Sequence, residues 1–139
     1  MIDDIGTGTY VLVFEITGTE RNRLGQFGGC YCYVGSAFGP GGIRARVSRH
    51  LRRDKPTKWH IDTLTGSPLF RPISIRTTGK RIECELAESI SRSWEGHPGF
   101  GASDCGCPTH LFRVPYLPGL DRALDRFGMT GFVPADFLS

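Results

Sequence analysis

The chain has 139 residues, which is the length of one domain and is enough to bury a hydrophobic core without disulfides or metal ions. Its 17 Lys and Arg residues exceed its 14 Asp and Glu residues by only three, too few to indicate a nucleic-acid-binding protein by themselves. Nineteen glycines and nine prolines predict tight connections between short elements. We expect a single domain over residues 1–139, with a core at about 8–114 and a C-terminal extension at 115–139.

The N-terminal sequence Met1–Asp4 has neither the basic nor the apolar region of a signal peptide. No apolar run approaches the roughly 20 residues that a membrane-spanning helix needs. Five cysteines are an odd number, which argues against a disulfide framework and leaves reduced thiols or metal ligands. We therefore expect a soluble, cytoplasmic protein with no membrane partner.

Three segments have the composition of β-strands. Tyr10–Ile16 is an almost continuous apolar run of β-branched and aromatic residues, which predicts a central strand buried on both faces. A polar, glycine-containing stretch at 18–29 leads to a second strand at Cys30–Val34, so we expect an antiparallel hairpin with a long solvated tip. A third strand is predicted at Leu69–Arg76, where Pro72 indicates that one side is a sheet edge.

A basic helix is predicted at 42–53, after a loop that proline and glycines impose at 38–42. Its apolar stripe consists of Ile43, Val47 and Leu51. Beside it runs a second stripe, which consists of Arg46, Arg49 and Arg53. His50 lies at the boundary, whereas Arg44 and Arg52 point away as ordinary solvated charges. Because the positive charge is concentrated at 44–58, the flanking arginines could line a phosphate-binding groove.

Further helices are predicted at about 59–64, at 82–94 and at 118–126, with a short strand at 110–114. His60 lies among apolar residues, a setting more typical of a structural histidine than of a catalytic one. In the helix at 82–94, Glu83 falls inside the apolar arc, while Glu85 and Glu88 project from the opposite side. A carboxylate on a buried face needs a partner or a cation, so Glu83 is the acid that requires an explanation.

The order of several short motifs resembles that of the GIY-YIG nucleases. Gly8-Thr-Tyr10 on the first strand and Tyr33-Val-Gly35 on the second are similar to the two signatures of that superfamily. Arg46-Val-Ser-Arg-His50 continues the strand–loop–helix pattern. Motifs similar to the Uri superfamily endonuclease-like branch are Gly39-Pro-Gly-Gly42, Trp59-His-Ile-Asp62, Glu83-Cys84, Gly99–Cys107 and His110-Leu-Phe112. The resemblance implies an α+β fold, with a three-stranded central antiparallel sheet flanked by helices and an extra C-terminal strand and helix.

The resemblance also implies roles for individual residues. Tyr10 would activate or orient the attacking water, and Tyr33 would lie beside the scissile phosphate. Gly35 would let the backbone turn close to the site, and Arg46 would stabilise the charge of the transition state. His50 corresponds to a histidine that is common one helical turn later. Alone, the two tyrosines could equally be core aromatics.

Glu83 corresponds to the metal-binding glutamate of the family, with Glu85 as the second choice, and one Mg²⁺ or Mn²⁺ ion is expected there. His60 could share proton transfer with His50. The residues expected to contact nucleic acid are Gly35, Ser36, Arg49, Arg53 and Lys58. DNA is the expected partner, RNA is not excluded, and a partner protein could supply specificity because the chain has no separate DNA-binding domain.

Two functions follow from these patterns. The first is a divalent-metal-dependent endonuclease that hydrolyses phosphodiester bonds in DNA, for which a structure-specific or repair-related role is compatible with the resemblance. The alternative is a non-catalytic module on the same fold that binds nucleic acid or another protein, which would bind DNA in a salt-sensitive way without cleaving it.

A zinc site is an alternative interpretation of Cys105-Gly-Cys107-Pro-Thr-His110, because cysteine and histidine are the usual zinc ligands. The candidates for a fourth ligand are Cys30, Cys32 and Asp104. The spacing is unusual for zinc, so we expect a glycine-rich loop with buried thiols instead.

Overall fold

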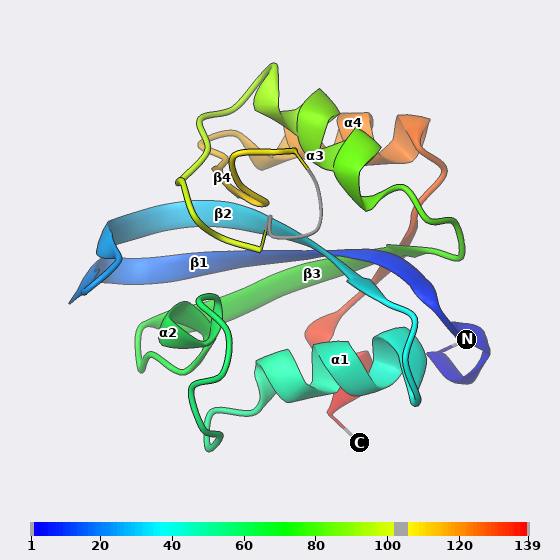
Figure 1. The fold of residues 1–139 in the computed structure, drawn as a ribbon, viewed down its shortest axis with the longest axis horizontal. Helices are drawn as coiled ribbons and strands as arrows, with labels where there is room; N and C mark the ends of the chain where they lie inside the picture. Colours follow the sequence, from blue (N-terminus) through cyan, green and yellow to red (C-terminus); the bar gives the residue numbers. More distant parts are fainter. Residues whose placement is uncertain (1, 102–105, 139) are drawn as a thin grey trace.

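The computed structural model describes residues 2–101 and 106–138. It is an α+β fold built on a five-stranded antiparallel sheet of order β4-β2-β1-β3-β5 (Figure 1). The strands are β1 (Gly8–Asn22), β2 (Gly25–Ala37), β3 (Phe70–Thr78), β4 (Leu111–Arg113) and β5 (Thr130–Phe132). The helices are α1 (Gly42–Leu51), α2 (Asp62–Thr65), α3 (Glu83–Ser91) and α4 (Leu117–Arg126), with 3₁₀ turns η1 (Ile2–Asp4) and η2 (Pro134–Phe137).

Strand β1 is covered on both faces, as its apolar run predicts. Alternate side chains of a strand point to opposite faces. Leu12 and Phe14 therefore join one core cluster together with residues of α1 and α2, while Val11 and Val13 join a second cluster with residues of α3 and α4. Figure 1 shows α1 and α2 below the sheet and α3 and α4 above it. The sheet thus separates two apolar layers.

The predicted long tip between the first two strands is wrong. Both strands continue through 18–29 and are joined by only Arg23 and Leu24, after a register shift between Ile16 and Glu20. Phe27 supplies the reason, because its side chain is 1% exposed and contacts the rings of Tyr31, His97 and Phe100. A single buried aromatic therefore anchors a ribbon whose polar composition is typical of a loop.

The C-terminal region adds more sheet than the sequence predicts. The expected strand is β4, which pairs with β2, and the expected helix is α4, but the three-residue strand β5 was not predicted. Strand β5 pairs with Ile75–Thr77 of β3, so Pro72 stays at an uncovered edge, as expected. Such a short strand carries no recognisable alternation. The helix predicted at 82–94 is shorter than expected, since α3 covers only Glu83–Ser91.

The four cysteines that the structure describes, Cys30, Cys32, Cys84 and Cys107, are not joined in disulfides. Among residues 2–101 and 106–138, no helix has both the length and the apolar character that crossing a membrane requires.

Candidate functional site

A cavity of about 150 Å³ lies where β1, β2, α1 and α3 meet. The residues that line it are Tyr10, Tyr33, Gly35, Ser36, Arg46, His50, Trp59, Glu83 and Gly101. All the residues that the sequence proposes as catalytic therefore border this cavity, with the exception of His60. They come from elements far apart in the chain, so only the fold brings them together.

Two glycines make room for the two tyrosines of the cavity. Tyr10 and Gly35 are direct partners in the β1–β2 pairing, and a Cβ atom at Gly35 would lie only 2.4 Å from the Tyr10 ring. A Cβ atom at Gly101 would lie 2.7 Å from the Tyr33 hydroxyl, and Gly101 also has a φ of +69°, which favours glycine. The glycine of the second signature thus has a steric role here, because it lets the Tyr10 ring cross the neighbouring strand.

Tyr10 and His50 form a buried hydrogen-bonded pair. The Tyr10 hydroxyl lies 2.7 Å from His50 Nε2, and both side chains are 1% exposed. Burial and the nearby Lys55 charge lower the pKa of His50 from 6.5 to about 3, so its imidazole is neutral at physiological pH. Burial and the neighbouring Tyr33 raise the pKa of Tyr10 well above 10, and Arg46 only partly opposes them. The resting pair is therefore a neutral phenol beside a neutral imidazole.

A phenolate at Tyr10 is therefore not the resting state, although Arg46 lies nearby. Desolvation of the charged form outweighs the attraction of Arg46. Tyr33 behaves in the same way, since burial and the Glu83 carboxylate raise its pKa to about 12. Both tyrosines are therefore neutral phenols at physiological pH.

Arg46 reaches the cavity from α1 and is held by an aromatic platform. Its guanidinium carbon lies 4.6 Å from the centroid of the Trp59 ring, and Nη1 donates to the Ser36 carbonyl oxygen at 3.5 Å. Trp59 lies within the helix predicted at about 59–64, but α2 begins only at Asp62, and Trp59 is half-buried beside Arg46 and packs against the core. A cation over an indole face is stabilised while it keeps part of its hydrogen-bonding capacity for a ligand.

The other two arginines of the predicted stripe have partners within the protein. Arg49 donates to both carboxylate oxygens of Asp62 at 2.9 Å. Arg53 donates to the carbonyl oxygens of Ser67, at 2.7 Å, and of Phe70. Their predicted role as nucleic-acid contacts thus competes with a structural one, because these guanidinium groups already fasten the segment after α1 to the rest of the fold.

The Asp62 carboxylate accepts several of the hydrogen bonds that hold this segment in place. Besides Arg49, its donors are the backbone N–H groups of Lys58 and Trp59, at 2.8 and 2.9 Å, and the Asp62 side chain is 1% exposed. Burial raises the pKa of Asp62, but the hydrogen bonds from Arg49 and from these two N–H groups outweigh burial and lower it to about 2. By contrast, Lys58 is exposed, with its ammonium group 5.0 Å from the Trp59 centroid.

Glu83 is the first residue of α3 rather than part of its packed face. Its side chain is 23% exposed, and Oε2 lies 3.2 Å from His110 Nδ1. It borders both the central cavity and a neighbouring one of about 270 Å³ that Arg81 and Cys84 also line. The expectation that Glu83 lies on the packed face of the helix is wrong: its carboxylate is a partly solvated group at the helix start, although it borders the central cavity and the exposed Glu85 does not among the residues described.

Thr9 and His110 position Glu83, and the sequence analysis assigned neither role. The Thr9 hydroxyl accepts the N–H of Ile82 at 3.1 Å and donates to the Lys80 carbonyl at 2.8 Å, which ties the start of α3 to β1. The sequence indicates His110 as a strand residue and a possible zinc ligand, whereas in the structure its Nδ1 faces Glu83. No local pattern could identify these contacts, because the paired residues are separated by more than 25 positions in the chain.

His60 lies in a different place from the one expected. It is exposed rather than set among apolar residues, and its Nδ1 lies 2.7 Å from the Gly99 carbonyl oxygen. It does not border the central cavity among the residues described. From this position it would not share proton transfer with His50.

The structure describes part of the proposed zinc motif. Cys105 and Asp104 lie outside the described residues, whereas Cys107 and His110 are described and approach Cys84 at the start of α3. One donor atom from each of these three residues lies within 4.8 Å of the others, so the group could hold a metal ion. The other cysteines proposed as ligands, Cys30 and Cys32, are not part of this group.

The burial of His50 predicts an acid-sensitive fold. The unfolded chain binds a proton at His50 near pH 6.5, whereas the folded chain does so only near pH 3. The unfolded state therefore carries more protons between these values, and the free energy of unfolding falls as the pH drops below 6.5. At about 1.4 kcal/mol per pH unit, the loss from pH 6.5 to 4.5 is about 2–3 kcal/mol.

Urea unfolding of wild type and His50→Asn at pH 7.5 and 4.5 checks this. The variant should show a smaller loss between the two pH values, while His60→Asn, which removes an exposed ring, should retain the wild-type difference. The stabilisation that the Asp62 carboxylate provides is present above its ordinary pKa of 3.8 and is lost mainly as the pH falls below that value. Asp62 therefore contributes little to the change between pH 7.5 and 4.5. If wild type and His50→Asn lost the same free energy of unfolding between pH 7.5 and 4.5, the prediction would be wrong.

Comparison with known proteins gives one family match. A family model described as "Domain of unknown function DUF123" matches residues 9–129, which include every described residue that lines the central cavity. No curated protein and no solved structure matches the chain.

Proposed function

The chain belongs to the family described as Domain of unknown function DUF123, and we propose from the chemistry of its cavity that it is a divalent-metal-dependent endonuclease acting on DNA. In this proposal the fold is that of a GIY-YIG nuclease of the Uri superfamily branch. The reaction is hydrolysis of a phosphodiester bond. RNA is the alternative substrate.

One observation carries the proposal: a tyrosine–histidine pair, a second tyrosine, an arginine and a glutamate from four different elements border a single cavity. A core aromatic does not need a guanidinium and a carboxylate beside it. A binding surface does not need a partly solvated acid, which would repel a phosphate unless a cation lay between them. Hydrolysis of a phosphodiester has a role for each of these groups: proton transfer for the tyrosine–histidine pair, charge stabilisation for the arginine and metal binding for the glutamate.

Arg46 is the phosphate-binding group of the proposal. Its stacking on Trp59 fixes the planar guanidinium at the cavity, where it can donate charge-assisted hydrogen bonds to a phosphate. Because Arg49 and Arg53 are engaged elsewhere, we assign the flanking contacts to Lys58 on one side and Arg81 on the other. Arg81 is exposed, stacks 3.7 Å from the Phe38 ring and borders the neighbouring cavity, which Glu83 also lines.

The Tyr10–His50 pair supplies the proton relay. As the attacking water loses a proton to the Tyr10 oxygen, Tyr10 passes its own proton to His50 Nε2, so no free phenolate forms. Neutral His50 can accept that proton, and the negative charge of a bound phosphate would favour its protonated form. Tyr33 contributes a neutral hydroxyl that can donate to a phosphate oxygen.

Glu83 fits a hard divalent cation. Mg²⁺ is typically held by one or two carboxylates and keeps several waters, and Glu83 is a partly solvated carboxylate at the meeting point of two cavities. The contact with His110 uses Oε2 and is compatible with a metal on the other oxygen. A bound Mg²⁺ or Mn²⁺ would neutralise phosphate charge and make a coordinated water more acidic.

A cleavage panel tests the proposal. Plain, flapped, branched and damaged DNA duplexes are incubated with the protein in Mg²⁺, Mn²⁺ or EDTA. The same reactions are run with Arg46→Ala and with the control Arg52→Ala, which removes an exposed arginine at the end of α1. We expect metal-dependent cleavage of at least one substrate, a loss of roughly 10²-fold in Arg46→Ala and near-wild-type activity in Arg52→Ala. Salt-sensitive binding without cleavage in any metal would favour the non-catalytic binding module instead.

A further inference from the structure

We propose that Cys84, Cys107 and His110 form a zinc site that fastens the segment before β4 to the start of α3. The proposal does not depend on nuclease activity. It rests on the chemistry of three side chains that the fold brings together from two segments of the chain.

The donor set is the first argument. Two thiols and one imidazole offer their ligand atoms within 4.8 Å of one another. Thiolate and imidazole are the ligands that Zn²⁺ prefers, whereas Mg²⁺ and Ca²⁺ prefer oxygen. In a tetrahedral zinc site neighbouring ligand atoms lie roughly 3.5–3.8 Å apart, so the distance between any two of the three donors needs to shorten by at most about 1.3 Å.

The surroundings of His110 are the second argument. A zinc-bound histidine usually donates its other ring N–H to a carboxylate, which fixes the tautomer and the ring orientation. The Glu83 carboxylate oxygen lies 3.2 Å from His110 Nδ1, in ion-pair contact but short of hydrogen-bond geometry, and His110 is 1% exposed, so a small rotation of the Glu83 side chain would complete this hydrogen bond. With a proton on Nδ1, Nε2 keeps the lone pair that binds the metal.

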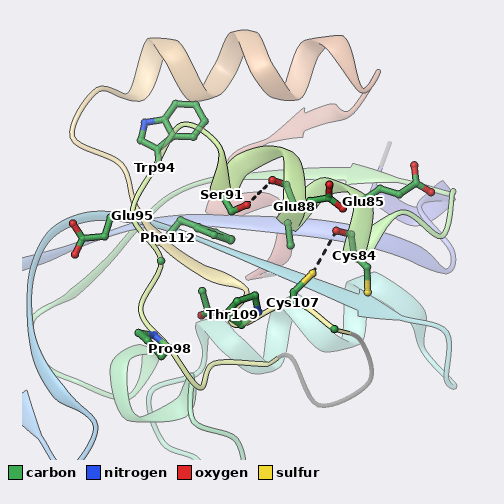
Figure 2. Close-up of a pocket in the computed structure, with 14 residues that line it drawn as sticks. Cys84, Glu85, Glu88, Ser91, Trp94, Glu95, Pro98, Cys107, Thr109 and Phe112 are labelled. Carbon is green, nitrogen blue, oxygen red and sulfur yellow. Dashed lines mark hydrogen bonds between the residues drawn. The ribbon is translucent and has the colours of Figure 1, made fainter.

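Access to the site is the third argument. Cys84 and Cys107 line a cavity of about 760 Å³ beside α3, where Figure 2 shows both sulfur atoms beneath the start of that helix. The Cys107 thiol lies 3.6 Å from the Cys84 carbonyl oxygen, so the two chain segments are already in contact. The two thiols thus border an open space through which an ion can reach them.

Binding would release protons and stabilise the fold. Each thiol loses its proton when it becomes a thiolate ligand, so zinc uptake liberates up to two protons per ion. The ion would close a loop between Cys84 and Cys107, which are 23 residues apart. A ligand that binds only the folded chain raises its unfolding temperature.

Metal titration of the tag-free, reduced and chelator-treated protein tests the proposal. Co²⁺ serves as the spectroscopic probe, because thiolate ligands give it intense near-ultraviolet charge-transfer bands. We expect these bands to saturate at one equivalent and to disappear when Zn²⁺ is added, and Zn²⁺ should raise the unfolding temperature. Mg²⁺ should do neither. Absence of thiolate bands in the wild-type protein would overturn the proposal, whatever the variants do.

Variants locate the site. Cys84→Ser and Cys107→Ser should each weaken Zn²⁺ binding by at least about 100-fold, while Cys30→Ser, which removes a half-buried thiol outside the group, should bind as wild type does. If a cysteine variant fails to fold, Zn²⁺ binding by His110→Gln tests the same site. Wild-type affinity in Cys84→Ser and His110→Gln would show that zinc binds elsewhere and would overturn the assignment.

Discussion

Glu83→Gln should lower DNA cleavage by roughly 10²–10³-fold and leave DNA binding within a few-fold of wild type. Glutamine keeps the size of the side chain but removes the charge that would hold a divalent cation at the junction of the two cavities. Cleavage is measured by nicking of supercoiled plasmid in Mg²⁺ and in Mn²⁺, and binding by fluorescence anisotropy in Ca²⁺.

Glu85→Gln and Glu88→Gln are the matched controls, since both acids are exposed on the same helix and do not border the central cavity among the described residues. Both controls should cleave as wild type does. If Glu83→Gln retained full activity while Glu85→Gln lost it, the metal would belong to Glu85. Full activity in all three variants would remove α3 from the proposed site.

Asp62→Ala should lower the free energy of unfolding by about 3–5 kcal/mol, the usual cost of leaving a buried charge without its partner. The substitution removes both hydrogen bonds from Arg49 and leaves two backbone N–H groups unsatisfied. Because Arg49 also stacks 4.2 Å from the Trp59 centroid, the loss should also loosen the platform that holds Arg46.

Urea denaturation measures the effect, with Asp54→Ala as the control because Asp54 is an exposed acid in the segment between α1 and α2. The control should change stability by less than about 0.5 kcal/mol. A double variant, Arg49→Leu with Asp62→Leu, should recover part of the loss, since it removes the unpaired charge. A loss below about 1 kcal/mol in Asp62→Ala would mean that this pair is as weak as a surface salt bridge.

The central strand β1 and the helix α1 show what a sequence can predict. The apolar run Tyr10–Ile16 predicts burial on both faces because side-chain direction in a strand depends only on position. The helical period of α1 likewise places Ile43 and Val47 in the core. In each case the pattern repeats over a few residues, so local geometry is enough.

The availability of each arginine could not be predicted in the same way. Arg46, Arg49 and Arg53 share one stripe of α1 and its extension, yet Trp59 holds the first at the cavity while Asp62 and backbone carbonyls engage the other two. These partners come from the segment after the helix. Helical spacing gives the direction of a side chain but not the group that meets it there.

The sequence by itself determined the order of the main strands and helices, apart from the short strand β5, and the basic helix, because these depend on short-range periodicity and on residue chemistry. The tertiary structure decided the protonation of Tyr10 and His50, since burial of both residues outweighs the nearby charges. It also decided that Cys84, rather than Cys30 or Cys32, approaches Cys107 and His110. Desolvation and long-range contact exist only after the chain has folded.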